Sequence, residues 1–152
     1  MADIQVEAGR TGRLLYARVR PNEDLVRSIE AVCRDHGITA ALVRGSLGSL
    51  TEACLEVPGG RQIQVSGAAV ETLTLMGEVR PVDGTPRARL SGTVSDADGR
   101  VFGGRFVEGR NPVCVTFEVA LEEWIPSPPP LAGEGEPQTK EKRTCHIAEA
   151  SW

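Results

Sequence analysis

The stretch NEDLVRSIEAVCRDHG, residues 22–37, is the part of the chain with a clear helical pattern. Its apolar side chains recur three and four positions apart, and they form one stripe made of Leu25, Ile29, Val32 and Cys33. Asn22 is a candidate N-cap, and Gly37 ends the segment. Four charged residues lie off the stripe, namely Arg27, Glu30, Arg34 and Asp35. We therefore expect the helix to cover a sheet with one face and to meet water with the other.

The rest of the sequence alternates apolar and polar residues with the period of a β-strand. In the first such segment Leu15, Ala17 and Val19 share one face. Further strands are expected near residues 40–47, 51–57, 68–79, 86–96, 100–107 and 113–121. Turn-forming residues with glycine separate several of these segments. The pattern predicts an α+β domain of six or seven strands with one principal helix packed on the sheet.

The composition is that of an ordinary globular domain. The chain has 152 residues, of which 40% are hydrophobic and 25% charged, so we expect one domain with a real core. The formal net charge of -4 argues against nonspecific electrostatic binding to nucleic acid or anionic lipid. No window is apolar enough to span a membrane, and the N-terminus lacks a signal-peptide core, so a cytoplasmic protein is expected.

A proline-rich run, PSPPP at residues 126–130, marks a change of organisation. Consecutive prolines cannot donate to a β-ladder or continue a helix. We therefore expect the folded domain to cover residues 1–125. Residues 126–152 are expected to form a proline-rich linker and a flexible C-terminal tail.

Five stretches occur in the order typical of one known family. They read RVRPNEDLVRSIEAVCRDHGI, ALVRGSLGSLTEACL, VETLTLMGEV, RARLSGTVSDADGRVFGGRFVEG and VCVTFEVAL. In this order the chain resembles the plants-and-prokaryotes-conserved (PPC) domain over residues 13 to 121. The resemblance implies a compact α+β domain with a mixed, barrel-like sheet and, as in prokaryotic members, a homotrimer. It also implies DNA binding as an alternative function, because plant members carry the domain after an AT-hook.

The chain departs from this family at the positions where a metal is expected. Many prokaryotic members have an HxH strand followed by GGH, and those histidines resemble metal ligands. Here the matching positions are Arg87, Arg89 and Arg105. A guanidinium stays protonated and has no lone pair for a metal, so we expect neither a family-type zinc site nor another cofactor.

The three arginines can meet on one face of the sheet. Arg87 and Arg89 are two residues apart on one strand. Arg105 joins their face if the loop of the hairpin has three residues, 97–99, with Gly99 in the left-handed region, so that residue 105 lies opposite Ser91. A two-residue loop would point Arg105 the other way.

Two interpretations of this arginine cluster remain open. In one, Glu118, Glu71 or Glu78 on neighbouring strands pairs with the arginines, and the cluster is an internal ion-pair network. In the other, Arg87, Arg89 and Arg105, with Glu118 beside them, bind a small carboxylate or phosphate, because an arginine fork binds such groups through two parallel hydrogen bonds.

Three functions follow from these observations. The first is a trimeric binding or regulatory module with an anion site at the arginine cluster. The second is DNA binding, which the 14 arginines and 17 acidic residues of residues 1–125 do not favour. The third is a metal-free lyase or isomerase acting on a carboxylate, with Glu118 as base. We expect no catalytic residue set of the nucleophilic kind and favour the binding module.

Overall fold

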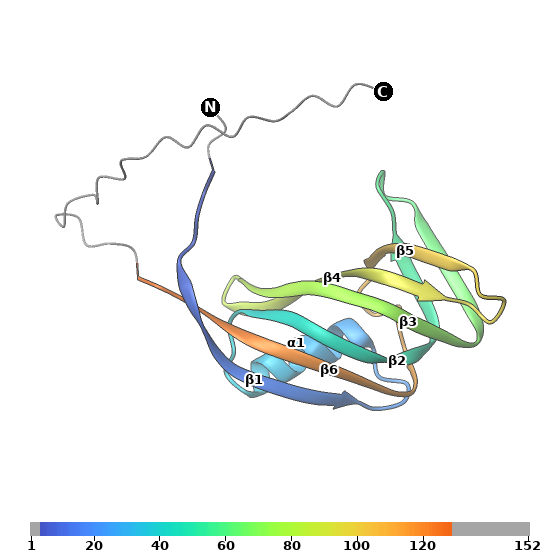
Figure 1. Ribbon diagram of the computed structural model, residues 1–152, viewed down its shortest axis with the longest axis horizontal. Coiled ribbons are helices and arrows are strands. Elements are labelled where there is room, and N and C mark those ends of the chain that lie inside the picture. Colours follow the sequence, from blue (N-terminus) through green and yellow to red (C-terminus); the bar gives the residue numbers. More distant parts are fainter. Residues whose placement is uncertain (1–3, 129–152) are drawn as a thin grey trace, which may run out of the picture.

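The computed structural model describes residues 4–128 as one helix and six strands (Figure 1). In chain order these are β1 (Gly9–Val19), α1 (Leu25–Asp35), β2 (Ala41–Glu56), β3 (Gln62–Val82), β4 (Thr85–Ser95), β5 (Val101–Phe106) and β6 (Val113–Pro126). The α+β class, the six strands and the single principal helix are confirmed for this part of the chain. Most of the expected tail, residues 129–152, lies outside the described residues.

The strands form one sheet in the order β1-β6-β2-β3-β4-β5. β5 also pairs with β2, which brings the far edge of the sheet back to its middle. The expectation of a mixed sheet is wrong, because every pairing between these strands is antiparallel. Each strand of the β2–β3–β4–β5 run follows its predecessor through a short connection, which reverses the chain direction.

The segments 40–47 and 51–57, expected as two strands, are one long strand, β2. Its ladder continues through local irregularities near Arg44 and near Ser49. Gly48, with φ +156, lies at one of them, and a Cβ there would come within 2.6 Å of the Thr116 carbonyl oxygen. The glycine therefore permits a bend with close backbone contact, which the sequence shows only as a break in the pattern.

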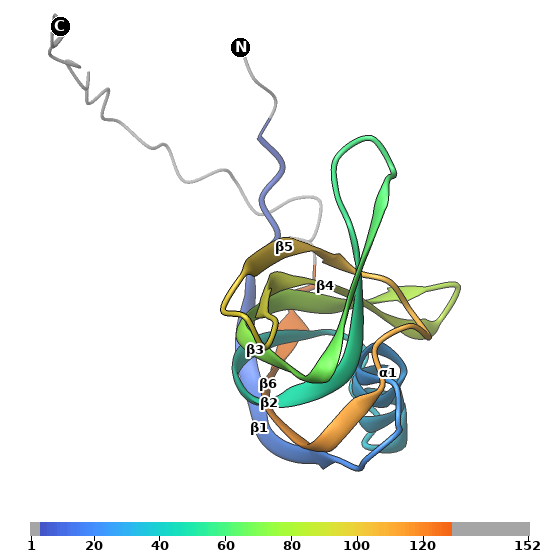
Figure 2. The same ribbon diagram turned by 90° about the vertical axis from the view of Figure 1, so that its right-hand side faces the viewer.

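Helix α1 lies against one face of the sheet, as Figures 1 and 2 show. Its buried apolar side chains are Leu25, Val26, Ile29 and Cys33. They pack with fully buried residues of the strands, of which Phe117 is the largest. The core is aliphatic apart from phenylalanine, in keeping with the 4% aromatic content. Burial raises the pKa of the Cys33 thiol to about 11, so this thiol is a structural apolar group.

The helix begins two residues later than the sequence suggested. Asp24 is the N-cap, and its carboxylate accepts a hydrogen bond of 3.0 Å from the backbone N–H of Arg27. The expected cap, Asn22, instead has φ +67 and donates its backbone N–H to the Val113 carbonyl. At the other end His36 is the C-cap, followed by Gly37 with φ +65.

Glu30 was expected to face water, and this expectation is wrong. Its side chain is only 8% exposed. One carboxylate oxygen accepts the backbone N–H of Ala88 at 2.9 Å, and the other accepts Nη1 of Arg87 at 3.3 Å. Glu30 lies four residues after Val26 and three before Cys33, so it belongs to the buried side of the helix.

Arg13 on the edge strand β1 connects the end of α1 to strand β6. Arg13 on β1 donates two side-chain hydrogen bonds of 2.8 Å to the carboxylate of Glu123 on β6. A third side-chain bond, of 3.0 Å, reaches the backbone carbonyl of His36 at the end of α1. The hydrogen bonds from Arg13 lower the pKa of the Glu123 carboxyl to about 2.

We expect this pair to make stability depend on pH in the acid range. The pKa of Glu123 in the unfolded chain is ~4.3. Its depressed pKa therefore contributes stability that is complete above that value and is lost as pH falls toward 2. Urea unfolding between pH 2 and pH 6 should show a shallower fall in the free energy of unfolding for Glu123→Gln than for the wild type. Equal slopes for the two proteins would contradict this assignment.

In the described part of the chain, no helix is long and apolar enough to cross a membrane.

Candidate ligand site at the fork of β4 and β5

The arginines expected to form a site lie where β4 and β5 separate. β5 pairs with β4 only opposite the stretch from Ser91 to Ser95. It then turns to β2, where Phe106 lies opposite Leu55 and the Val107 N–H donates to the Cys54 carbonyl at 3.0 Å. The first half of β4 is left without a strand on that side, and a fork opens between the two strands.

The hairpin that sets this geometry has a three-residue loop, residues 97–99. The backbone N–H of Asp96 donates to the Arg100 carbonyl at 3.0 Å, and Gly99 has φ +78. Arg105 consequently lies opposite Ser91. Of the two loop lengths that the sequence left open, the chain has the three-residue loop, and Arg105 shares a face of the sheet with Arg89.

A small cavity of about 220 Å³ occupies the fork. Ala88 and Arg89 line it from β4, Arg105 and Phe106 line it from β5, and Val26 lines it from α1. Two carboxylates, those of Glu56 and Glu108, also reach its wall. The cavity thus combines an apolar floor with charges of both signs.

A larger cavity of about 580 Å³ adjoins it on the side of the β2–β3 hairpin. This hairpin projects beyond the sheet in Figure 2. Its tip contributes residues 57–60, and β4 and β5 contribute Gly92, Gly103 and Gly104. Arg105 and Glu56 line both cavities and form an ion pair with each other, so this pair lies between the two spaces.

The glycines of β4 and β5 serve close packing of the backbone. A Cβ on Gly104 would lie 2.8 Å from the Glu56 carbonyl oxygen, and one on Gly92 would lie 2.0 Å from the Thr74 carbonyl oxygen. Gly103 is different, because a Cβ there would make only ordinary contacts, the nearest at 3.4 Å. Among these glycines Gly92 and Gly104 are thus required by the fold of this single chain.

The ion-pair interpretation holds for two of the three predicted arginines. Arg87 pairs with Glu30 at 3.3 Å and, more loosely, with Glu108 at 3.8 Å. Arg105 pairs with Glu56. Arg89 is exposed and has no ion pair or side-chain hydrogen bond within residues 4–128. The structure therefore leaves one guanidinium of the cluster available at the small cavity.

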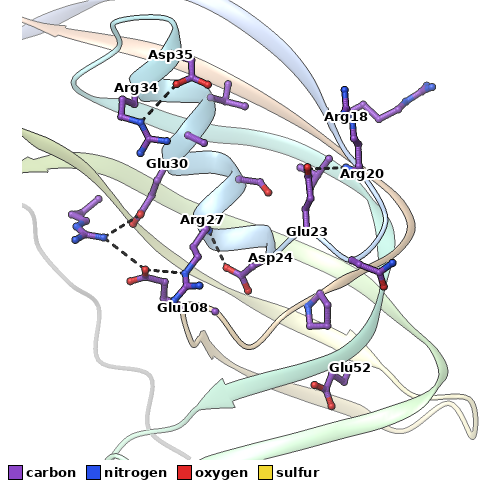
Figure 3. Close-up of a pocket in the computed structure, with 18 residues that line it drawn as sticks. Arg18, Arg20, Glu23, Asp24, Arg27, Glu30, Arg34, Asp35, Glu52 and Glu108 are labelled. Atoms are coloured by element: carbon purple, nitrogen blue, oxygen red, sulfur yellow. Dashed lines mark hydrogen bonds and ion pairs between the residues drawn. The ribbon is translucent and has the colours of Figure 1, made fainter.

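Arg87 lines a different cavity from Arg89 and Arg105, although Glu108 lines both cavities. The position of Arg87 borders a broad groove of about 930 Å³ along the exposed side of α1. Figure 3 shows this groove, with Glu30 and Glu108 joined to neighbouring basic groups by dashed lines. Arginines and acidic residues alternate around the groove, and several pair with each other, as Arg27 does with Glu108 at 3.3 Å. With five arginines and six acidic residues in its wall, the groove has nearly balanced charge.

Glu118 does not meet the arginine cluster. It accepts a hydrogen bond of 2.5 Å from the Tyr16 hydroxyl and bonds of 3.0 and 2.6 Å from Arg18. These bonds, first that of Tyr16 and then those of Arg18, lower the pKa of the Glu118 carboxyl. Glu118 lines neither cavity at the fork, so a base at Glu118 and a clamp at Arg89 and Arg105 are in different places.

The other two expected partners, Glu78 and Glu71, make no ion pair with these arginines within the described residues. Glu78 lies opposite Arg89 on β3 but bonds Nε of Arg80 at 2.9 Å. Glu71 lies opposite Ser95. The carboxylates that do reach the site, Glu30, Glu56 and Glu108, come from α1, the end of β2 and the loop after β5. Of these only Glu30 had a signal in the sequence, its spacing from Val26 and Cys33.

No group of three or more His, Cys, Asp or Glu side chains positioned for a metal ion is found among residues 4–128. Arg87, Arg89 and Arg105 occupy the three positions at which the family resemblance suggested metal-binding histidines.

Comparison with known proteins agrees with the fold. The family model of the Plants and Prokaryotes Conserved (PCC) domain matches residues 6–125. A PPC protein of Pyrococcus horikoshii is 25% identical, with a TM-score of 0.68, over 80% of this chain and 85% of that one. A metal-containing protein of Archaeoglobus fulgidus is 23% identical, with a TM-score of 0.71, over 83% and 89% of the two chains. A candidate DNA-binding protein of Bacteroides thetaiotaomicron is 16% identical, with a TM-score of 0.65, over 76% and 83%.

Among curated proteins, the chain is similar to part of the bifunctional protein GlmU of Synechococcus. One such relative, from strain JA-3-3Ab, is 30% identical over 108 residues. The match covers 71% of this chain but only 16% of the relative's length. A second relative, from strain JA-2-3B'a(2-13), is 30% identical over 103 residues, which are 15% of its length. The similarity is thus confined to one portion of a much longer protein.

Proposed function

Because the chain belongs to the Plants and Prokaryotes Conserved (PCC) domain family, we propose that it is a binding module for a small ligand that carries a carboxylate or phosphate. The proposed site is the small cavity at the fork of β4 and β5. The observation that carries the proposal is Arg89, an exposed guanidinium without an ion pair within residues 4–128, at the wall of that cavity.

The chemistry of the guanidinium supports this assignment. Arg89 presents a planar fork of N–H donors, which matches the two oxygens of a carboxylate. Arg105 gives Nη2 to Glu56, and its Nε and Nη1 have no hydrogen-bond partner in the described part of the chain. An oxyanion in the cavity would therefore find one free fork and additional donors beside it, next to an apolar floor that includes Phe106.

The test is thermal stabilisation by acetate, phosphate, sulfate and citrate at matched ionic strength. At a concentration 100 times its Kd, a ligand stabilises the folded state by about 2.7 kcal/mol. For a domain of this size, that raises Tm by about 5–10 °C. Arg89→Ala should abolish the rise and still fold, because Arg89 makes no ion pair within residues 4–128.

Arg20→Ala is the matched control, since Arg20 is also exposed and its side chain makes no ion pair in the described part of the chain. This variant should respond to ligand as the wild type does. An equal rise in Arg89→Ala would remove the site, and a loss of response in Arg20→Ala would show that the effect is a general one of surface charge.

We also propose that the module is a homotrimer, as the family resemblance implies. The face of the sheet away from α1 supports self-association, because Leu14, Tyr16, Leu47 and Met76 point outward there and are 65–71% exposed. Light scattering on purified protein should give three times the chain mass of 16.2 kDa. Leu47→Glu should lower that mass, and a wild type of single-chain mass at all concentrations would contradict the proposal.

DNA binding is the second candidate. It is favoured by the structural similarity to the candidate DNA-binding protein of B. thetaiotaomicron. Within residues 1–125, however, 17 acidic residues outnumber 14 arginines, and many of those arginines are paired. A gel-shift titration at low salt tests it: binding that weakens steeply with salt would support this candidate, and no shift would remove it.

A further inference from the structure

We propose that the ligand of the fork cavity is a zwitterion, the head group of an α-amino acid, with its carboxylate on Arg89 and its ammonium group on Glu108. This inference rests on the proposed function and narrows the class of ligand. It starts from the presence of two carboxylates, Glu56 and Glu108, in the wall of a cavity proposed to bind an anion.

Glu108 has binding capacity that the fold does not use. One of its oxygens, Oε1, lies 3.3 Å from Nε of Arg27 and 3.8 Å from Nη1 of Arg87. Both contacts are long for charged groups, and the side chain is 45% exposed. Its other oxygen, Oε2, accepts no hydrogen bond from the rest of residues 4–128. One carboxylate oxygen of a residue in the cavity wall therefore has no hydrogen-bond partner within the described residues.

A positively charged group without an ion pair within the described residues lies in the wall of the same cavity. Arg89 makes no ion pair within the described residues, while Arg105 and Glu56 largely neutralise each other. The other charged groups in the wall are Arg89, which has no ion pair within the described residues, and Glu108, whose Oε1 lies near Arg27 and Arg87 and whose Oε2 accepts no hydrogen bond there. A ligand with a single negative charge would pair with Arg89 but would also be repelled by Glu108. A zwitterion satisfies both groups, and it brings no net charge into the cavity.

The sizes of the two cavities indicate which part of such a ligand each cavity would hold. The small cavity, about 220 Å³, has the volume of about seven waters in the liquid, which suits a head group of a few heavy atoms. The adjoining cavity, about 580 Å³, is lined by glycines with Pro58 and Thr93. Its charged residues are Glu56 and Arg105, which pair with each other. The side chain of the ligand is accordingly uncharged.

Three compounds that share the 3-methylbutyl chain separate the inference from the proposed function. Leucine carries both charges, 4-methylpentanoate lacks the amino group, and isoamylamine lacks the carboxylate. Calorimetry at pH 7 on the full chain should show leucine binding at least about tenfold more tightly than either analogue, because each lost contact is a hydrogen bond to a charged group.

Each outcome decides a different statement. If 4-methylpentanoate binds as tightly as leucine, the zwitterion inference is wrong and the anion site stands. If leucine and 4-methylpentanoate both fail to bind, and the inorganic anions do as well, both proposals are wrong. Lysine and glutamate should bind more weakly than leucine, and equal binding of either would overturn the placement of the side chain in the glycine-lined cavity.

Two variants locate the charges. Glu108→Gln should weaken leucine binding about tenfold and leave the affinity for 4-methylpentanoate unchanged or higher. Arg89→Gln should weaken both. Glu71→Gln is the matched control, because Glu71 is exposed on β3 and lines neither cavity at the fork. A Glu108→Gln variant that binds leucine as well as the wild type would overturn the assignment of the ammonium group.

Discussion

Replacing Gly92 with alanine is expected to lower the free energy of unfolding by about 3 kcal/mol, the upper end of the range for overpacking a folded interior. The added Cβ would lie 2.0 Å from the Thr74 carbonyl oxygen and 3.2 Å from a ring carbon of Phe106. The oxygen belongs to the backbone of β3, so relief requires a shift of the strand. Urea denaturation of the two proteins measures the change.

Gly103→Ala is the matched control for this experiment. Gly103 is on β5, opposite Thr93 of β4, and it is next to Gly104, the residue opposite Gly92. A Cβ added to Gly103 would make ordinary contacts at 3.4 Å or more. The control should differ from the wild type by less than about 1 kcal/mol. If both variants lose the same stability, glycine is needed for backbone freedom, and the close contact with Thr74 does not explain the effect.

Glu30→Ala is expected to lower the free energy of unfolding by about 2 kcal/mol. The substitution removes the acceptor of the Ala88 backbone N–H and leaves this donor unpaired at the partly covered edge of β4. It also removes the closer of the two partners of Arg87. The free energy of unfolding, from urea denaturation at pH 7, gives the size of the effect.

Glu108→Ala tests whether the effect of Glu30→Ala comes from the loss of a buried hydrogen-bond acceptor or from the loss of an ion pair with Arg87. Glu108 also pairs with Arg87, but it is 45% exposed, and exposed ion pairs contribute little. This variant should lose less than about 1 kcal/mol. Comparable losses in the two variants would mean that the charge on Arg87 matters more than the hydrogen bond from Ala88.

The parts of the fold set by local chemistry could be predicted from the sequence. The helix shows its apolar stripe over residues 25–33, and all of this stripe is buried except Val32, which is half-buried. The turn between β4 and β5 shows Asp98-Gly99 in the sequence; its loop length was left open, and the three-residue loop that forms places Arg105 opposite Ser91. Both follow from side-chain period and turn chemistry within a few residues, which do not depend on the rest of the chain.

The parts set by distant segments could not be predicted in this way. Asp24 caps the helix in place of Asn22 because the backbone of Asn22 bonds Val113, about 90 residues away. The partners of Arg87 and Arg105 are Glu30 and Glu56, which the sequence separates from them by 57 and 49 residues. The predicted partner Glu118 was plausible by type, but the order of the strands places it beside Tyr16 and Arg18.

The antiparallel pairing of β1 with β6 brings the two ends of the domain close together. Gly9 lies opposite Pro126, and the Ser127 N–H donates to the Ala8 carbonyl at 2.8 Å, so the chain enters and leaves the sheet at one point. A unit with adjoining ends can be joined to, or inserted into, another polypeptide without disturbance of its core. The same architecture can thus stand alone or be carried as an appendage, and such a junction would lie near the first half of β4, because Glu7, just before β1, pairs with Arg80, which lies opposite Arg87.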